Sequence, residues 1–90
     1  MTTQAIESGY YVEMTDTFGG EPNYCWVRRA VVQANSTREA LKLARREFGY
    51  LAKHGRITSD YGDEIHWKPY GQHRVIMVRW SDNPHEMSFA

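Results

Sequence analysis

The side chains best suited to covalent or metal chemistry are one cysteine and four histidines. Cys25 is a candidate nucleophile, but a reactive cysteine needs a neighbouring base and a lowered pKa. It stands between Tyr24 and Trp26, which is typical of a packed thiol on a half-buried strand. The histidines are His54, His66, His73 and His85. Their spacing is not that of a zinc site, so we predict no catalytic residue and no metal ligand.

Two further clusters share residue types with ligand sites without matching their spacing. Asp60, Asp63 and Glu64 bring three acids close to one turn, but they lack the periodicity of a calcium-binding loop. Gly19 and Gly20 are a turn signal and not a phosphate cradle, because no helix follows them directly. The sequence therefore predicts a protein that is not an enzyme and that holds no cofactor.

Length and composition indicate one globular domain over residues 1–90. The chain is 41% hydrophobic and 13% aromatic, which argues against wholesale disorder. A single cysteine excludes an internal disulfide and fits a reducing, cytoplasmic setting. The first residues lack the basic and apolar regions of a signal peptide. The longest apolar run, 75–78, is too short to cross a membrane, so no membrane association is expected.

The pattern of the chain predicts an α+β fold with the order β-β-α-β-β. Alternating β-branched and aromatic residues, bounded by turn residues, predict four strands. These cover 10–15, 24–34, 64–69 and 73–80. We expect them to form a four-stranded, mostly antiparallel sheet with one helix packed on one face. The ordered core should cover about 9–81, with frayed termini, and 56–62 should be a loop or a short edge segment.

The helix is predicted by a change of period after a capping box. Ser36 can accept the backbone N–H of Glu39, while the glutamate reaches back. An apolar stripe then runs through Ala40, Leu41, Ala44, Phe48, Leu51 and Ala52. The stripe favours a helix over 37–54 that is capped by Gly55, and the alternative is a helix that stops at Gly49.

Strand alternation divides the sheet into two faces. Face A contains Tyr10, Val12, Met14, Trp26, Ala30, Val32, Ile65, Trp67, Ile76, Val78 and Trp80, with Arg28 as an interruption. Face B contains Tyr11, Glu13, Val27, Arg29, Val31, His66, Lys68, Val75, Met77 and Arg79. Face A is the more apolar and should take the helix. Face B is too apolar for a wet sheet surface, so it is either a binding interface or is covered by a loop or the C-terminal tail.

The interface alternative gives the first candidate site. The residues that would bind a partner protein, or a second copy in a homodimer, are Tyr11, Arg29, Lys68, Met77 and Arg79 on face B, with Phe18 and Glu21 at the hairpin tip. Phe18 is at a loop tip, where it either folds back onto the sheet, which we favour, or anchors a partner. Most other aromatics belong to the core, with Tyr11 and Tyr70 as the expected exceptions.

A basic stripe on the helix gives the second candidate site. Residues 28–56 contain eight bases and two acids, although the whole chain has zero net charge. The stripe consists of Arg38, Lys42, Arg45, Arg46 and Lys53. It is either an ordinary solvated helix face or a surface for anions, including nucleic-acid phosphates. A pI near 6.9 is low for a nucleic-acid-binding module.

The run Asp-Thr-Phe-Gly-Gly-Glu-Pro-Asn-Tyr-Cys-Trp-Val-Arg-Arg at 16–29, followed by a helix and by Asp-Tyr-Gly-Asp at 60–63, resembles small uncharacterised proteins of phages and prophages. The resemblance covers about residues 10–80 and implies a stoichiometric binding protein in the host cytoplasm, such as an inhibitor of a host defence complex like CRISPR. The expected function is thus non-enzymatic binding of a host protein or complex. A small nucleic-acid-binding accessory protein is the alternative.

Overall fold

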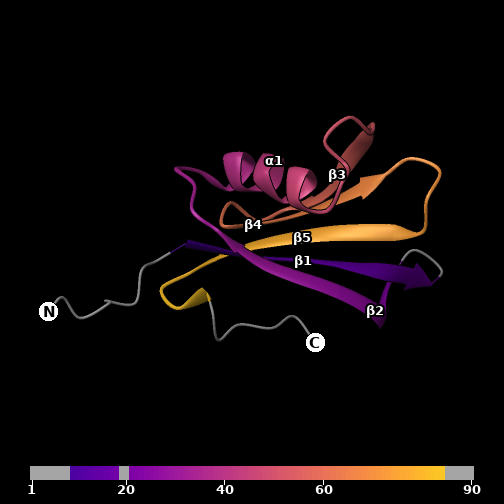
Figure 1. Cartoon of the computed structure of the whole chain (residues 1–90), viewed down its shortest axis with the longest axis horizontal. Coiled ribbons are helices and arrows are strands. Elements are labelled where there is room, and N and C mark those ends of the chain that lie inside the picture. Colours follow the sequence, from indigo (N-terminus) through magenta and orange to yellow (C-terminus); the bar gives the residue numbers. More distant parts are fainter. Residues whose placement is uncertain (1–8, 19–20, 85–90) are drawn as a thin grey trace, which may run out of the picture.

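A long β-hairpin and a three-stranded meander share one antiparallel sheet (Figure 1). The computed structural model describes residues 9–18 and 21–84. Its elements are β1 (Gly9–Phe18), β2 (Glu21–Val32), α1 (Thr37–Glu47), β3 (Gly55–Asp60), β4 (Glu64–Pro69) and β5 (Arg74–Ser81). The strand order is β2-β1-β5-β4-β3, so β2 and β3 are the edges. The expected fraying of the termini falls largely on residues 1–8 and 85–90, which lie outside the described ranges.

The α+β class is confirmed, but the prediction of four strands is wrong. The described chain forms five, because the segment expected to be a loop or edge piece is the strand β3, paired along β4. Its sequence contains the β-branched residues Ile57 and Thr58, and exposure alternates along it. Ile57 packs against the core, which gives the strand a reason to join the sheet.

The helix begins where the capping box predicts and ends earlier than expected. The Glu39 N–H donates to Ser36 Oγ at 3.1 Å, and the Glu39 carboxylate accepts the backbone N–H of Asn35 at 2.6 Å. At the other end, Gly49 has φ +85°. The N–H of Gly49 donates to the Arg46 carbonyl and that of Tyr50 to the Arg45 carbonyl, which is the Schellman arrangement. The helix over 37–54 is therefore wrong, and the alternative stop at Gly49 is correct.

Replacing Gly49 with alanine should lower the free energy of unfolding by about 1–2 kcal/mol, since a Cβ is unfavourable in the left-handed region. Nothing lies within 4 Å of the added Cβ, so the loss comes from the backbone alone. Gly49→Asn should cost less, because asparagine tolerates this conformation. Urea denaturation of the three proteins measures the difference, and equal stability of all three would contradict this description of the helix end.

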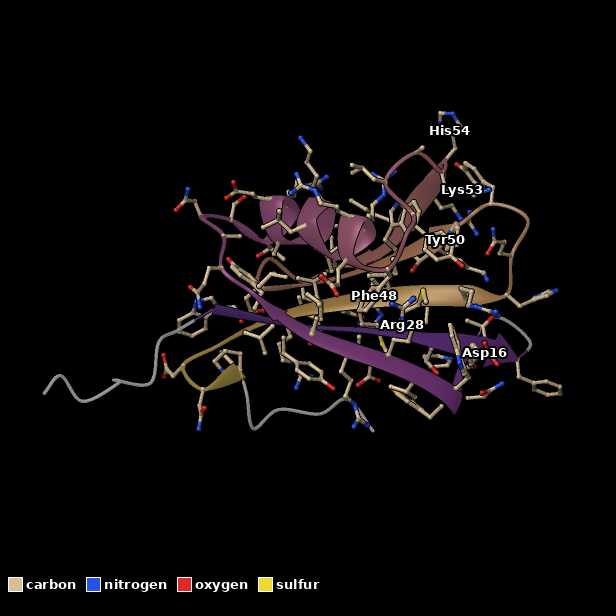
Figure 2. All side chains as sticks on the ribbon, in the orientation of Figure 1. Asp16, Arg28, Phe48, Tyr50, Lys53 and His54 are labelled. Atoms are coloured by element: carbon tan, nitrogen blue, oxygen red, sulfur yellow. The ribbon has the colours of Figure 1, made fainter. Side chains whose placement is uncertain are left out.

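The hydrophobic core lies between α1 and face A. Ala40, Leu41, Ala44 and Phe48 are buried against residues of β1, β4 and β5, including Val12, Ile65, Trp67, Ile76 and Val78. Arg28, which interrupts the apolar pattern of face A, places its guanidinium 5.5 Å from the Phe48 ring centroid (Figure 2). Leu51 and Ala52, expected on the buried stripe, lie beyond the helix and are exposed.

Candidate binding surfaces

The centre of face B is buried. Tyr11, Val75 and Met77 are each less than a tenth exposed, while Val27 and Val31 are half-buried. Of the two alternatives for face B, this burial favours the covered face over the open interface, and the exposure expected of Tyr11 is wrong. The binding of a partner or a second copy at this face stays an untested prediction.

A buried carboxylate on β1 organises one side of face B. Glu13 is fully buried, and its Oε1 accepts the Tyr11 hydroxyl at 2.5 Å and Arg29 Nε at 3.3 Å. Burial of the phenol, followed by its hydrogen bond to Glu13 and the negative charge there, raises the pKa of Tyr11 to about 12. Arg29, a predicted partner-binding residue, thus has an intramolecular role.

The two other predicted cations of face B are also engaged. Arg79 Nε lies 2.8 Å from Glu64 Oε1, and His66 Nε2 lies 2.7 Å from Glu64 Oε2. Burial acts to raise the pKa of Glu64, but the hydrogen bonds from Arg79 and His66 outweigh it and hold that pKa below its usual range. Lys68 Nζ donates to the Gln72 carbonyl at 3.1 Å. These hydrogen-bond and ion-pair networks were not predicted from the sequence. A signal for one of them was the position of Glu13, an acid within the otherwise apolar run of β1.

Alkaline solution should destabilise the protein through Tyr11. An unfolded tyrosine loses its proton near pH 10.0, whereas the folded Tyr11 holds it until about pH 12. The folded state therefore binds more protons in this window, and stability is intact below pH 10 and falls by up to about 2–3 kcal/mol as pH rises through 12. Tyr11→Phe should reduce this loss, and Tyr61→Phe, at an exposed phenol, should not. Urea titrations at each pH measure it; identical slopes for Tyr11→Phe and wild type would refute the assignment.

The tip of the β1–β2 hairpin presents exposed side chains. Phe18 is 80% exposed, so the favoured prediction that it folds back is wrong and the anchoring alternative remains open. Glu21 is exposed as well. Nearby on β5, Arg74 pairs with Asp16 at 2.8 Å and stacks its guanidinium 4.7 Å from the Trp26 ring centroid. Gly19 and Gly20 lie outside the described residues.

The predicted basic stripe separates into engaged and unengaged cations. Arg45 donates to the carbonyls of Tyr50, Leu51 and Lys53, so it stabilises the turn after α1. Arg38 pairs with Asp60 at 2.9 Å on the surface. Lys53 lies in that turn and not on the helix, next to His54, which points away from the sheet (Figure 2).

Lys42 and Arg46 are the members of the stripe that remain unengaged on α1. Both are exposed, and neither has a hydrogen-bond or ion-pair partner among residues 9–18 and 21–84. Pairing with an acid one turn away would neutralise such a cation. Since Lys42 and Arg46 have no such partner, they add unneutralised positive charge to the outer surface of α1.

A groove runs between α1 and β3. We call it the α1–β3 groove, and it is lined by Arg38, Leu41, Lys42, Arg45, Gly55, Arg56, Ile57 and Trp67. Four of these eight residues are basic, and the described lining contains no acid. Trp67 is only 4% exposed, and the Arg45 guanidinium lies 4.5 Å from its ring centroid. The groove therefore offers cationic walls over an apolar floor.

Arg56 is the groove residue that sequence reasoning missed. It is exposed, has no ion-pair partner in the described part of the chain, and stands directly opposite Lys68 in the β3–β4 ladder. Like charges opposite one another in a sheet are unfavourable, so this position would be relieved by an anion. The signal for Arg56 was its place among the bases of 28–56, but the prediction of a loop or a short edge segment over 56–62 did not place it beside β4 and α1.

The residues considered for covalent catalysis or metal binding do not lie together in one site. Across the described residues, no three His, Cys, Asp or Glu side chains are arranged to hold a metal ion. His66 pairs with Glu64, while His54 and His73 are exposed at the opposite end of the sheet. His85 and the side chain of Cys25 lie outside what the structure describes. Within the same residues, the single helix α1 is neither long nor apolar enough to cross a membrane.

Comparison with known proteins finds no matching family model, no significantly similar curated protein and no significantly similar solved structure.

Proposed function

We propose that this is a small non-enzymatic binding protein that engages an anionic macromolecule through the α1–β3 groove. The observation that carries the proposal is a pair of exposed cations at this groove: Lys42 on the α1 side and Arg56 at the β3 edge, on the sheet face that bears Lys68, both without counterions among the described residues. Exposed cations without counterions attract anionic partners and speed their association. By analogy with the small phage proteins it resembles, its biological role is stoichiometric inhibition of a host complex, such as a CRISPR defence complex.

The groove is a better candidate than face B. The face B cations are paired with Glu13 and Glu64 or bound to carbonyl groups, and its central apolar residues are buried. A partner would have to break those contacts before binding. The groove needs no such rearrangement, because Lys42 and Arg56 are already exposed.

Nucleic acid is the second candidate function, and the unengaged cations of α1 favour it. Phosphate recognition would use Arg46 and Lys53, which lie outside the groove, together with Lys42 at the groove. Binding driven by phosphate contacts weakens steeply with salt.

Two double variants with the same change of charge separate these functions. Lys42→Glu with Arg56→Glu alters the groove, whereas Arg46→Glu with Lys53→Glu alters exposed bases outside it. Binding of a fluorescent polyglutamate peptide and of an oligothymidylate is measured by anisotropy between about 50 and 200 mM salt. We expect the groove variant to lose affinity for polyglutamate by at least about tenfold and the matched control to lose much less.

The possible results of this experiment distinguish binding at the groove from nucleic-acid binding. Equal losses in both variants would show that general positive charge is enough and would overturn the groove as the site. Strong, steeply salt-dependent binding of oligothymidylate, weakened by the Arg46/Lys53 variant, would favour nucleic acid. Circular dichroism of each variant checks that the fold is intact.

A further inference from the structure

The outer edge of β3 is open beside the α1–β3 groove. β3 is an edge strand whose one strand neighbour is β4, so the backbone groups along its other edge have no strand partner within the described part of the chain. Such an edge is a template for an additional strand. A register shift between Ile57 and Ser59 divides the pairing of β3 with β4, and the segment before the shift, Gly55–Ile57, has all three of its residues in the lining of the groove.

The charges around this edge favour an acidic strand. A strand laid beside β3 would direct alternate side chains to the α1 side, because successive residues point to opposite faces. On that side, carboxylates would meet Lys42, whereas Arg38 is already paired with Asp60. On the opposite face, a carboxylate would meet Arg56 and relieve its repulsion with Lys68, which stands directly opposite it on β4.

The floor of the groove favours a peptide over a nucleic acid. Single-stranded nucleic acids bind by stacking bases on exposed aromatic rings. The aromatic ring of this groove, Trp67, is buried and is covered by the Arg45 guanidinium. The backbone edge of β3, in contrast, offers hydrogen bonds that match a peptide main chain.

We propose that an extended acidic segment of a partner protein adds to β3 as a sixth strand, with alternate Asp or Glu side chains against Lys42. This inference rests on the proposed function, since it names the class of anion that the groove takes. Main-chain hydrogen bonds to β3 supply affinity, and the basic walls select the charge of the segment.

The test uses two peptides with the same charges. One is a fluorescein-labelled peptide of alternating glutamate and valine; the other is the same peptide with an N-methyl group on every backbone nitrogen, which removes its hydrogen-bond donors along both edges. We expect the unmodified peptide to bind at least about tenfold more tightly, since strand pairing depends on those donors. Lys42→Glu with Arg56→Glu should abolish the preference and Arg46→Glu with Lys53→Glu should preserve it.

The other possible results separate strand addition from general anion binding and from nucleic-acid binding. If both peptides bind equally and both are lost in the groove variant, the groove binds anions and strand addition is overturned. If neither peptide binds while oligothymidylate does, the peptide proposal fails in favour of nucleic acid. If no polyanion binds, the proposed function fails with it.

Discussion

Trp67→Ala should lower the free energy of unfolding by about 3–5 kcal/mol, the range for deleting a large buried aromatic. Trp67 is buried in the core on face A, and its ring meets the Tyr50 ring edge-on at 6.4 Å between centroids. The Arg45 guanidinium covers the same ring. The variant should therefore lose both core packing and the floor of the groove. Urea denaturation followed by far-ultraviolet circular dichroism measures the loss.

Two further variants make this result interpretable. Trp80→Ala removes the same side chain from a position that is 42% exposed, and it should cost clearly less. Trp67→Phe keeps an aromatic ring and should remain folded even if the alanine variant does not. Similar losses for Trp67→Ala and Trp80→Ala would mean that Trp67 is not the packed centre described above.

Gly55→Ala should destabilise the protein by about 1–3 kcal/mol or more, because an added methyl has no space. A Cβ at this position would overlap the Trp67 indole and lie 2.5 Å from the Lys68 carbonyl oxygen. Neither neighbour is the free end of a flexible side chain, so β3 must move away from β4. Besides the lower melting temperature, we expect weaker binding of acidic peptides, since the groove would be deformed.

Ser59→Ala on the same strand is the control for Gly55→Ala. It adds no atoms, and its stability should stay within about 0.5 kcal/mol of wild type. Thermal unfolding and peptide binding are measured together for both variants. If Gly55→Ala unfolded at the wild-type temperature, the close packing of β3 over Trp67 would be wrong.

Local chemistry made parts of the fold predictable. The capping box at Ser36 fixed the start of α1, and alternation predicted β4 with the bounds observed, Glu64–Pro69. The end of α1 was harder to predict, because the apolar stripe continues to Leu51 and Ala52 after the chain has left the helix at Gly49. That error also obscured β3, which was expected only as a loop or a short edge segment and is in fact a full edge strand over Gly55–Asp60.

The site was less predictable than the fold, because it depends on which charges meet in space. Arg29 and Arg79 looked available on face B, but long-range pairing with Glu13 and Glu64 engages them. Arg45 looked like part of a free stripe, yet it binds three carbonyls beyond the helix. Arg56 gained importance only through its position opposite Lys68 and beside α1. None of these contacts follows from spacing along the chain.

The most direct test of the groove as the binding site is a nuclear magnetic resonance titration of the 15N-labelled protein with the alternating glutamate–valine peptide. The account predicts that backbone amide shifts change most along the α1–β3 groove, at Lys42, Arg56 and Ile57. Changes centred instead on Phe18 and Trp26 at the hairpin tip, or on Tyr11 and Met77 of face B, would contradict it, as would a spectrum that the peptide leaves unchanged.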